Sequence, residues 1–409
     1  MTQASSETSM ASAESKTRPS FVEFVVIISM MMSLTALSID AMLPALPQIG
    51  SDLGIGDPND RQLVVSLIFV GLAVGQLFFG PLSDRTGRKP AIYAGFTVYI
   101  AGTFMALFAT GFSVLLLGRI LQGVGISSPR AVTMALVRDR YEGRAMARVM
   151  SFVMTVFILV PMLAPSLGQA LLGFSSWRAI FASYVLIALV TLLWFGLRMP
   201  ETLSPENRSP FSTHQFVRAL REFVTFRRAV GFTVMSGLIG GAHLGYLNSS
   251  QQIFQEQYAL GNLFPIYFAI IALSIGLASL VNARLVVRLG MNVLVRNSLA
   301  AMLALSLAAL VIGVLTAGQP PLWLLTVYLM PTFFCVGILF GNMNALAMQP
   351  LGHIAGIGAA LVGFFATLIS VAVGVIIGQS YGGTVLPLVA GMASVAAVSL
   401  LIVRWTERG

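Results

Sequence analysis

Twelve long apolar runs constrain the fold of this chain more than any other feature. They fall at residues 23–48, 61–82, 90–110, 112–136, 148–172 and 176–197, and again at 229–255, 264–284, 292–316, 321–348, 354–378 and 384–403. A helix crosses the hydrocarbon core of a bilayer in about 20 residues, so each run is long enough to span it. Because 57% of the 409 residues are hydrophobic and only 10% are charged, we expect lipid to surround them. The sequence therefore predicts an all-α integral membrane protein with twelve transmembrane helices.

A polar stretch at residues 198–228, with several prolines and arginines, divides the runs into six plus six. It predicts a cytoplasmic central loop between an N-terminal six-helix bundle at 21–197 and a C-terminal six-helix bundle at 229–405. Residues 1–20 are rich in Ser, Thr and Ala and predict a disordered cytoplasmic tail, with a cleaved signal peptide as the alternative.

Basic residues indicate the orientation of the helices. Arginine and lysine cluster in alternate loops, at 85–89, 138–148, 284–296 and in the central stretch, whereas the loops between them hold little beyond Arg61 and Arg178. The positive-inside rule then places both termini and the central loop in the cytoplasm. This topology explains the net charge of +9, so we expect no nucleic-acid partner.

The loop after the second run has a specific pattern. It reads Gly80-Pro81-Leu82-Ser83-Asp84-Arg85-Thr86-Gly87-Arg88-Lys89. Its glycines allow a tight turn, and its opposite charges can cap neighbouring helix ends. The loop resembles the signature loop of the major facilitator superfamily, in which such a cluster latches the two halves together on the cytoplasmic side. The resemblance assigns this gate or latch to Gly80, Asp84, Arg85, Gly87 and Arg88, and a loop that only directs topology is the alternative.

Three further stretches narrow the resemblance to the drug:proton antiporters of the bicyclomycin and chloramphenicol-resistance type. They are residues 38–47, 119–125 and 161–168. The resemblance implies a major facilitator fold of two pseudosymmetric six-helix bundles in a bacterial plasma (inner) membrane. It also implies alternating access with protons as the coupling ion and no other cofactor.

The last of these stretches resembles the antiporter motif through Pro161, Pro165 and Gly168. It departs from the motif where Gln169 stands in place of a second glycine and where Ala164 stands in place of an earlier one. These departures weaken the motif as an indication of transport direction.

Asp40 is the one acid, of fifteen, that lies well inside an apolar run. A charge in hydrocarbon costs about 2.5–3.5 kcal/mol and persists mainly where it faces a cavity or a partner. At 1.5 Å per residue, Asp40 lies about 24 Å above the cytoplasmic face and Arg119 about 9 Å below the opposite face, so their depths are similar. We expect Asp40 to carry the proton, Arg119 to pair with it and Gln122 to be a second donor. A purely structural ion pair is the alternative.

Arg130 follows Arg119 by eleven residues, which places it on nearly the same side of the helix, three turns closer to the cytoplasm. Two interpretations remain open. Arg130 extends a polar track from the proton site, or it is a structural partner near the cytoplasmic gate, with Asp84 as its counterion.

Polar side chains gather in the seventh and tenth runs, where contact with lipid is unfavourable. We expect these uncharged groups to contact the substrate: Tyr246, Asn248, Gln251, Gln252, Asn342 and Asn344. Hydrogen bonding between helices is the alternative. His243 is expected to be a packed histidine, and no cluster of His, Cys or acids indicates a metal site or catalysis.

The sequence therefore predicts a proton-coupled secondary transporter, not an enzyme, that exports small, mostly lipophilic drugs or antibiotics. Besides lipid, its expected partner is the small-molecule substrate, and a monomer suffices for alternating access. No nucleotide-binding loop is found that would couple ATP. The alternatives are a transporter of the same fold dedicated to one metabolite or siderophore, and a membrane receptor or channel without coupled transport.

Overall fold

The computed structural model describes residues 19–208 and 213–407, which contain helices and no strand. The first half contains α2 (Phe21–Asp40), α3 (Leu46–Asp52), α4 (Leu63–Thr86), α5 (Arg88–Leu107), α6 (Phe112–Arg140), α7 (Gly143–Phe174) and α8 (Arg178–Arg198). After α9 (Thr213–Thr225), the second half contains α10 (Arg227–Gln251), α11 (Phe264–Leu289), α12 (Met291–Leu315), α13 (Leu322–Met348), α14 (Ala355–Gln379) and α15 (Leu386–Glu407).

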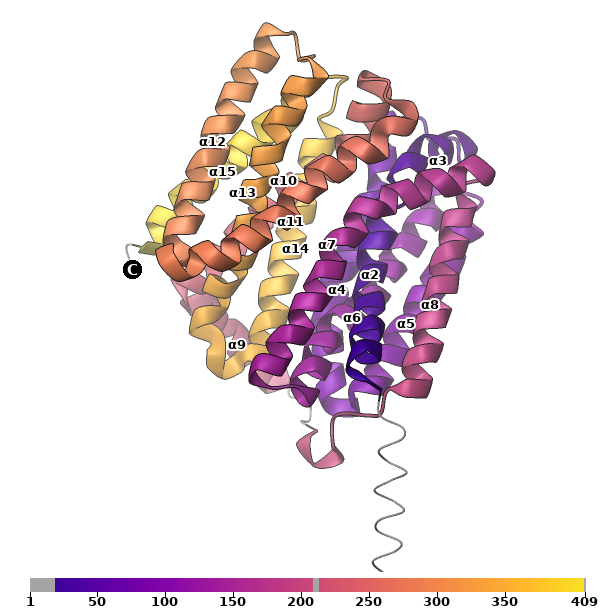
Figure 1. Cartoon of the computed structure of the whole chain (residues 1–409), viewed down its shortest axis with the longest axis vertical. Coiled ribbons are helices and arrows are strands. Elements are labelled where there is room, and N and C mark those ends of the chain that lie inside the picture. The colour runs from indigo at the N-terminus through magenta and orange to yellow at the C-terminus, as the bar shows by residue number, and fades with distance from the viewer. Residues whose placement is uncertain (1–18, 209–212, 408–409) are drawn as a thin grey trace, which may run out of the picture.

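The described ranges contain eleven apolar helical stretches that are long enough to cross a membrane. One of these stretches, Leu322–Gln379, holds both α13 and α14, so the number of spans is the predicted twelve. The helices form two bundles that lie side by side, α2 to α8 and α10 to α15 (Figure 1). Between the bundles, α4 packs on α14 and α7 packs on α11. The predicted fold class is confirmed.

Glycine allows α4 and α6 to pack backbone against backbone. A Cβ on Gly71 would lie 1.9 Å from the carbonyl oxygen of Ile120, and a Cβ on Gly123 would lie 2.0 Å from that of Ile68. Small residues at such crossings let membrane helices approach closely. This contact holds α6, which carries Arg119, against α4.

α9 differs from the sequence prediction, which treats residues 198–228 as a loop. Ala219 and Phe223 are buried on one side of this helix, and Phe223 stacks on Phe365 of α14 with ring centroids 5.7 Å apart. Arg218 and Arg221 are exposed on the other side. A short amphipathic helix has the average composition of a polar loop, which explains the difference. The expected tail at 1–20 lies almost wholly outside the described residues.

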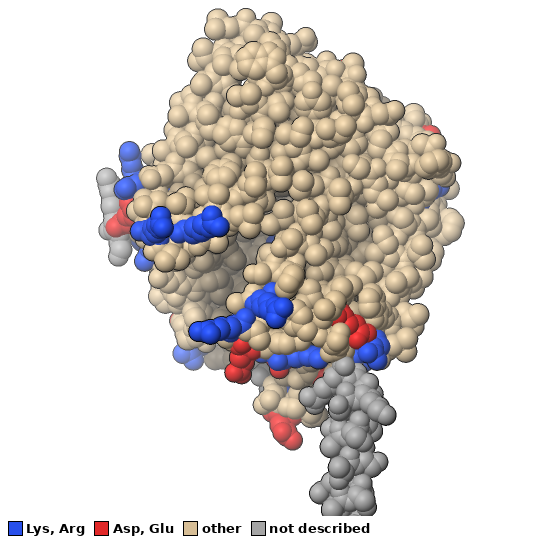
Figure 2. Space-filling model, viewed as in Figure 1, with Lys and Arg blue, Asp and Glu red and all other residues tan. Residues whose placement is uncertain are grey.

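The two ends of the bundles differ in charge. We call the end at which α2 begins and α4, α6 and α8 end the basic end, and the other end the opposite end. In Figure 2 the Lys and Arg side chains gather mainly toward the basic end, at the bottom and left of the view. The difference agrees with the loop pattern that the sequence predicts.

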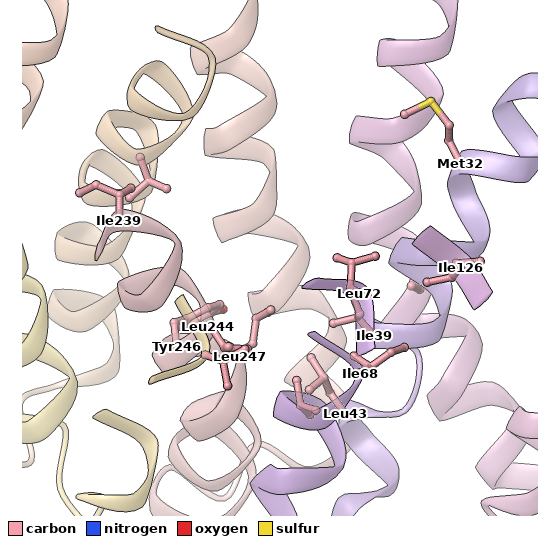
Figure 3. Close-up of a cluster of buried hydrophobic side chains, with 14 of the residues drawn as sticks. Met32, Ile39, Leu43, Ile68, Leu72, Ile126, Ile239, Leu244, Tyr246 and Leu247 are labelled. Atoms are coloured by element: carbon pink, nitrogen blue, oxygen red, sulfur yellow. The ribbon is translucent and has the colours of Figure 1, made fainter. Parts of the chain in front are cut away.

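An apolar layer lies between the bundles in the half near the opposite end. Figure 3 shows Leu43 and Ile68 of the first bundle beside Leu247 of the second, and all three are at most 2% exposed. Ile39, which precedes Asp40, is also buried in this layer. The residue that precedes Asp40 is therefore packed among buried apolar side chains.

Candidate functional site

Asp40 is the last residue of α2 and is 6% exposed. Its carboxyl group forms no hydrogen bond or ion pair with any residue that the structure describes. Tyr184 of α8 and Tyr246 of α10 lie near enough for a charge on Asp40 to act on their hydroxyl groups. Both hydroxyls are buried and have no hydrogen-bond partner. A carboxyl group and two phenols, drawn from both bundles, therefore have unused hydrogen-bonding capacity.

Arg119 does not pair with Asp40 in this structure, contrary to the sequence prediction. Its Nε donates to the carbonyl oxygen of Val64 at 2.7 Å, and its Nη2 donates to the carbonyl oxygen of Ser38 at 2.8 Å. The physical reason is the end of α2, because carbonyls in the last turn of a helix lack intrahelical donors and attract a cation. Arg119 thus positions the helix end that carries Asp40.

Gln122 also bonds differently from the prediction. Its Oε1 accepts from Arg119 Nη1 at 2.8 Å, and its Nε2 donates to Thr103 Oγ1 of α5 at 2.9 Å. The hydroxyls of Ser38 and Tyr99 are 2.6 Å apart in the same region. These buried bonds connect α2, α5 and α6, so Gln122 orients Arg119 and is no donor to Asp40.

Arg88 is the centre of the predicted latch. Its Nη1 lies 2.5 Å from Asp84 Oδ1, and its Nε lies 2.9 Å from Asp139 Oδ2 of α6. Glu201, after α8, accepts from the backbone N–H groups of Arg88 and Lys89 at 2.9 and 3.0 Å. These bonds join α4, α5 and α6 within the first bundle.

Asp84 is the latch residue that lies near the second bundle. A Cβ on Gly356, at the start of α14, would lie 4.0 Å from Asp84 Oδ2. The N-terminus of a helix attracts an anion, so this position stabilises the ionised carboxylate of Asp84. Gly87 has a φ of 108°, which glycine adopts readily. Gly80 has open space around its Cα, and Arg85 is exposed, so neither takes part in these contacts.

Arg130 is exposed and forms no bond to Asp84, whose described partner is Arg88. The interpretation of Arg130 as a structural partner of Asp84 is therefore wrong for this structure.

Polar residues at the end of α10 and directly after it connect the two bundles at the opposite end. Asn248 Oδ1 accepts from Ser66 Oγ of α4 at 3.1 Å. Gln252 Oε1 accepts from Gln62 Nε2 at 2.6 Å, and Gln252 Nε2 donates to Asn59 Oδ1 at 2.8 Å. Asn248 and Gln252, predicted to bind substrate, therefore hold the bundles together instead.

Further contacts strengthen this end. Asn59 Nδ2 donates to the carbonyl oxygens of Gln379 and Tyr381 at 3.1 and 2.9 Å, and Arg61 Nη2 lies 3.0 Å from Glu256 Oε1. We call the contacts of residues 59, 61, 62, 66, 248, 252, 256, 379 and 381 the polar clasp. The sequence analysis missed Asn59 and Gln62, although polar residues at the start of an apolar run were a signal for them.

The other predicted substrate contacts have mixed positions. Gln251 Nε2 donates to Glu256 Oε1 at 3.2 Å, and Asn342 Nδ2 donates to Asn282 Oδ1 of α11 at 2.7 Å, so both bond within the second bundle. Asn344 is exposed. The ring of Tyr246 packs on Phe333, with centroids 4.6 Å apart.

The predicted antiporter motif lies beside Asp40. Pro161 and Pro165 fall inside α7, and Gly168 follows them on the same helix. A Cβ on Gly168 would lie 1.7 Å from the carbonyl oxygen of Ala41. The motif therefore allows α7 to pack against the end of α2.

Comparisons with known proteins agree with this architecture. The chain matches the sequence pattern of the Major Facilitator Superfamily over residues 27–375. It is 30% identical over 358 residues to the uncharacterized MFS-type transporter YdgK of Bacillus subtilis, covering 86% of this chain and 87% of that protein. It is 25% identical over 388 residues to the bicyclomycin resistance protein homolog of Haemophilus influenzae, covering 92% and 94%. The xylose transporter XylE from E. coli, in a partially occluded inward open conformation, has a similar fold, with a TM-score of 0.71, 12% identity and coverage of 93% and 96%.

Proposed function

Because the chain belongs to the major facilitator superfamily, we propose that it is a proton-coupled transporter that exports small, mostly lipophilic drugs or antibiotics by alternating access. Members of this superfamily are transporters and not enzymes, and the chain is a multi-pass membrane protein. Its similarity to a bicyclomycin resistance protein homolog supports a drug as the cargo.

We place the basic end in the cytoplasm of a bacterium, with the protein in the inner membrane and both termini inside. The positive-inside rule supports this orientation. The polar clasp then lies on the external side, where it closes the path between the bundles. The structure accordingly corresponds to a state that is closed to the outside.

The observation that carries the proposal is the unpartnered carboxyl group of Asp40. An ionised carboxylate that is buried without a partner is very unfavourable, so the group is assigned its neutral, protonated form in this state. Its position at the end of α2, beside the apolar layer and a phenol of each bundle, lets its charge influence the fit of the bundles.

The exchange follows from this arrangement. With the basic end open, Asp40 releases its proton to the cytoplasm, and the cargo binds in the space between the bundles. After the bundles rock, the cargo leaves on the external side and a proton from outside neutralises Asp40 again. Asp40 takes part in both proton release inside and proton uptake outside. The bundles therefore do not return to the state open to the cytoplasm with no cargo and an ionised Asp40.

The proposal is tested in inverted membrane vesicles that contain the protein and an imposed pH gradient. Lipophilic cations, anionic dyes and neutral antibiotics are added one at a time, and the collapse of the gradient is followed. We expect several compounds to release protons in the parent and none to do so in Asp40→Asn. Glu206→Gln, which removes an exposed acid after α8, serves as the control and is expected to behave like the parent.

Two results would contradict the proposal. Either no compound collapses the gradient in the parent, or Asp40→Asn responds like the parent. A response to a single compound of the panel would instead support a transporter dedicated to one metabolite or siderophore.

A further inference from the structure

α6 changes the side that it exposes along its length. In the half near the opposite end, Val114, Leu117 and Leu121 are exposed on one side. In the half near the basic end, Arg130 and Met134 are exposed. Nine residues separate Leu121 from Arg130, or about two and a half turns, so the two lie on opposite sides of the helix. Because the first side is apolar and faces lipid, Arg130 faces the interior of the protein.

Arg130 is exposed on the side of α6 that otherwise packs against protein. It lies on the same side of α6 as Arg119, which is fully buried. Its side chain is nevertheless exposed, whereas Ser127 and Thr133, three residues to either side, are buried, so solvent reaches Arg130 on the side of α6 that faces protein. Ten residues separate it from the end of α6 at Arg140, or about 15 Å. The positive-inside rule explains arginines at a helix end, but it does not explain an arginine about 15 Å from that end.

No counterion holds Arg130 in place. It forms no hydrogen bond, ion pair or ring contact with the described residues. The nearest acids along α4 and α6 at the basic end, Asp84 and Asp139, both pair with Arg88. A guanidinium group presents five donors and suits a carboxylate or phosphate, so the donors of Arg130 suit an anion.

The basic end of the bundles is positively charged on both sides of a hollow in its surface. Figure 2 shows the surface hollowed between two groups of Lys and Arg, one over the lower end of α11 and one over the lower end of α7. These ends carry exposed arginines at positions 144 and 148 of α7 and 284 and 288 of α11. Asn344 of α13 is also exposed. It follows the buried Phe333 by eleven residues, so the two side chains lie on nearly the same side of α13.

We propose that Arg130 binds an anionic group of the cargo, a carboxylate, sulfonate or phosphate, as it enters between the bundles from the basic end. This inference rests on the proposed transport function and narrows it, because the same positive charge repels lipophilic cations. Arg130 is thus a specificity-determining residue, and the proton site at Asp40 is separate from it along the path.

The test measures binding of two xanthene dyes of similar shape to the purified protein by fluorescence anisotropy. Fluorescein is anionic and rhodamine 6G is cationic. In Arg130→Gln, we expect the affinity for fluorescein to fall about 10- to 100-fold, which is the loss expected when one hydrogen bond to a charged group is removed. The affinity for rhodamine 6G should stay equal or rise. Arg130→Lys keeps the charge and should retain most of the fluorescein binding. Arg404→Gln, which removes an exposed arginine of α15, should change neither affinity.

Three outcomes of the dye assay would overturn the inference. The parent binds rhodamine 6G and not fluorescein, Arg130→Gln weakens both dyes equally, or it weakens neither. To test whether the anion is a lipid headgroup, fluorescein binding is also measured in nanodiscs of phosphatidylcholine with and without phosphatidylglycerol. If Arg130→Gln alters fluorescein binding only when phosphatidylglycerol is present, Arg130 holds a lipid headgroup and the cargo assignment is wrong.

The proton assay in vesicles separates this inference from the proposed function. Fluorescein binding that depends on Arg130, without proton movement for any compound, would support the anion site and reject proton-coupled export. Proton movement driven only by cations and neutral compounds, lost in Asp40→Asn, would support export and reject the anion site.

Discussion

Gly168 of α7 lies against the carbonyl group of Ala41, the residue that follows Asp40. A Cβ on Gly168 would lie 1.7 Å from that oxygen, which is closer than any real contact. The antiporter motif and the candidate proton carrier are therefore one packed unit, in which α7 supports the end of α2.

The first prediction concerns this contact. Gly168→Ala must push α7 away from the end of α2, and such overpacking costs about 1–3 kcal/mol. We expect a lower Tm in detergent and reduced transport in vesicles, since Asp40 shifts with its helix end. Gly173→Ala, on the same helix with open space around its Cα, is the matched control and should match the parent. Equal effects of the two substitutions would show that the close contact is unimportant.

The second prediction concerns the polar clasp. Gln62→Ala removes the donor to Gln252 Oε1, and a buried hydrogen-bonding group without a partner costs about 1–3 kcal/mol. The population that is open at the opposite end should rise about 5- to 100-fold. The measurement is the rate at which a membrane-impermeant maleimide, added from outside, labels Leu247→Cys in a Cys335→Ser background.

The exposed Gln349 provides the control for the clasp. Gln349→Ala should leave the labelling rate unchanged. Labelling of the Gln62→Ala protein at the parent rate would mean that the clasp does not set the balance between the two states.

The third prediction concerns Arg119. Arg119→Ala leaves the carbonyls of Ser38 and Val64 and the amide of Gln122 without their donor. Each orphan costs about 1–3 kcal/mol, so we expect a large fall in Tm. Arg119→Lys should recover only part of it, because an ammonium group does not reproduce the planar guanidinium fork.

Arg85→Ala removes an exposed arginine from α4 and should leave Tm unchanged. If Arg119→Ala keeps the parent Tm and loses only proton coupling, Arg119 acts on the proton and its positioning role is rejected.

Much of the fold could be predicted from the sequence because long apolar runs have one stable arrangement in lipid. The twelve spans and the superfamily resemblance are confirmed, and the drug-efflux resemblance agrees with a relative named for bicyclomycin resistance. α9 was missed because a helix of 13 residues with one apolar face has the composition of a loop.

The side-chain partners at the site were harder to predict. Equal depth made a pair of Asp40 and Arg119 reasonable, but depth does not show that carbonyls at the end of α2 compete for the guanidinium. Similarly, the polarity of Asn248 and Gln252 indicates that they avoid lipid without showing which neighbour they meet. Their partners come from the other bundle, nearly two hundred residues away in sequence, so only the folded structure identifies them.

The central claim is that Asp40 exchanges its proton for cargo. The most direct measurement is the proton released into weakly buffered solution when purified protein binds the compound that gives the strongest vesicle response. The account predicts proton release by the parent and by Glu206→Gln, and none by Asp40→Asn even at concentrations of compound that saturate binding. Equal release by the parent and Asp40→Asn, or binding to the parent without release, would contradict it.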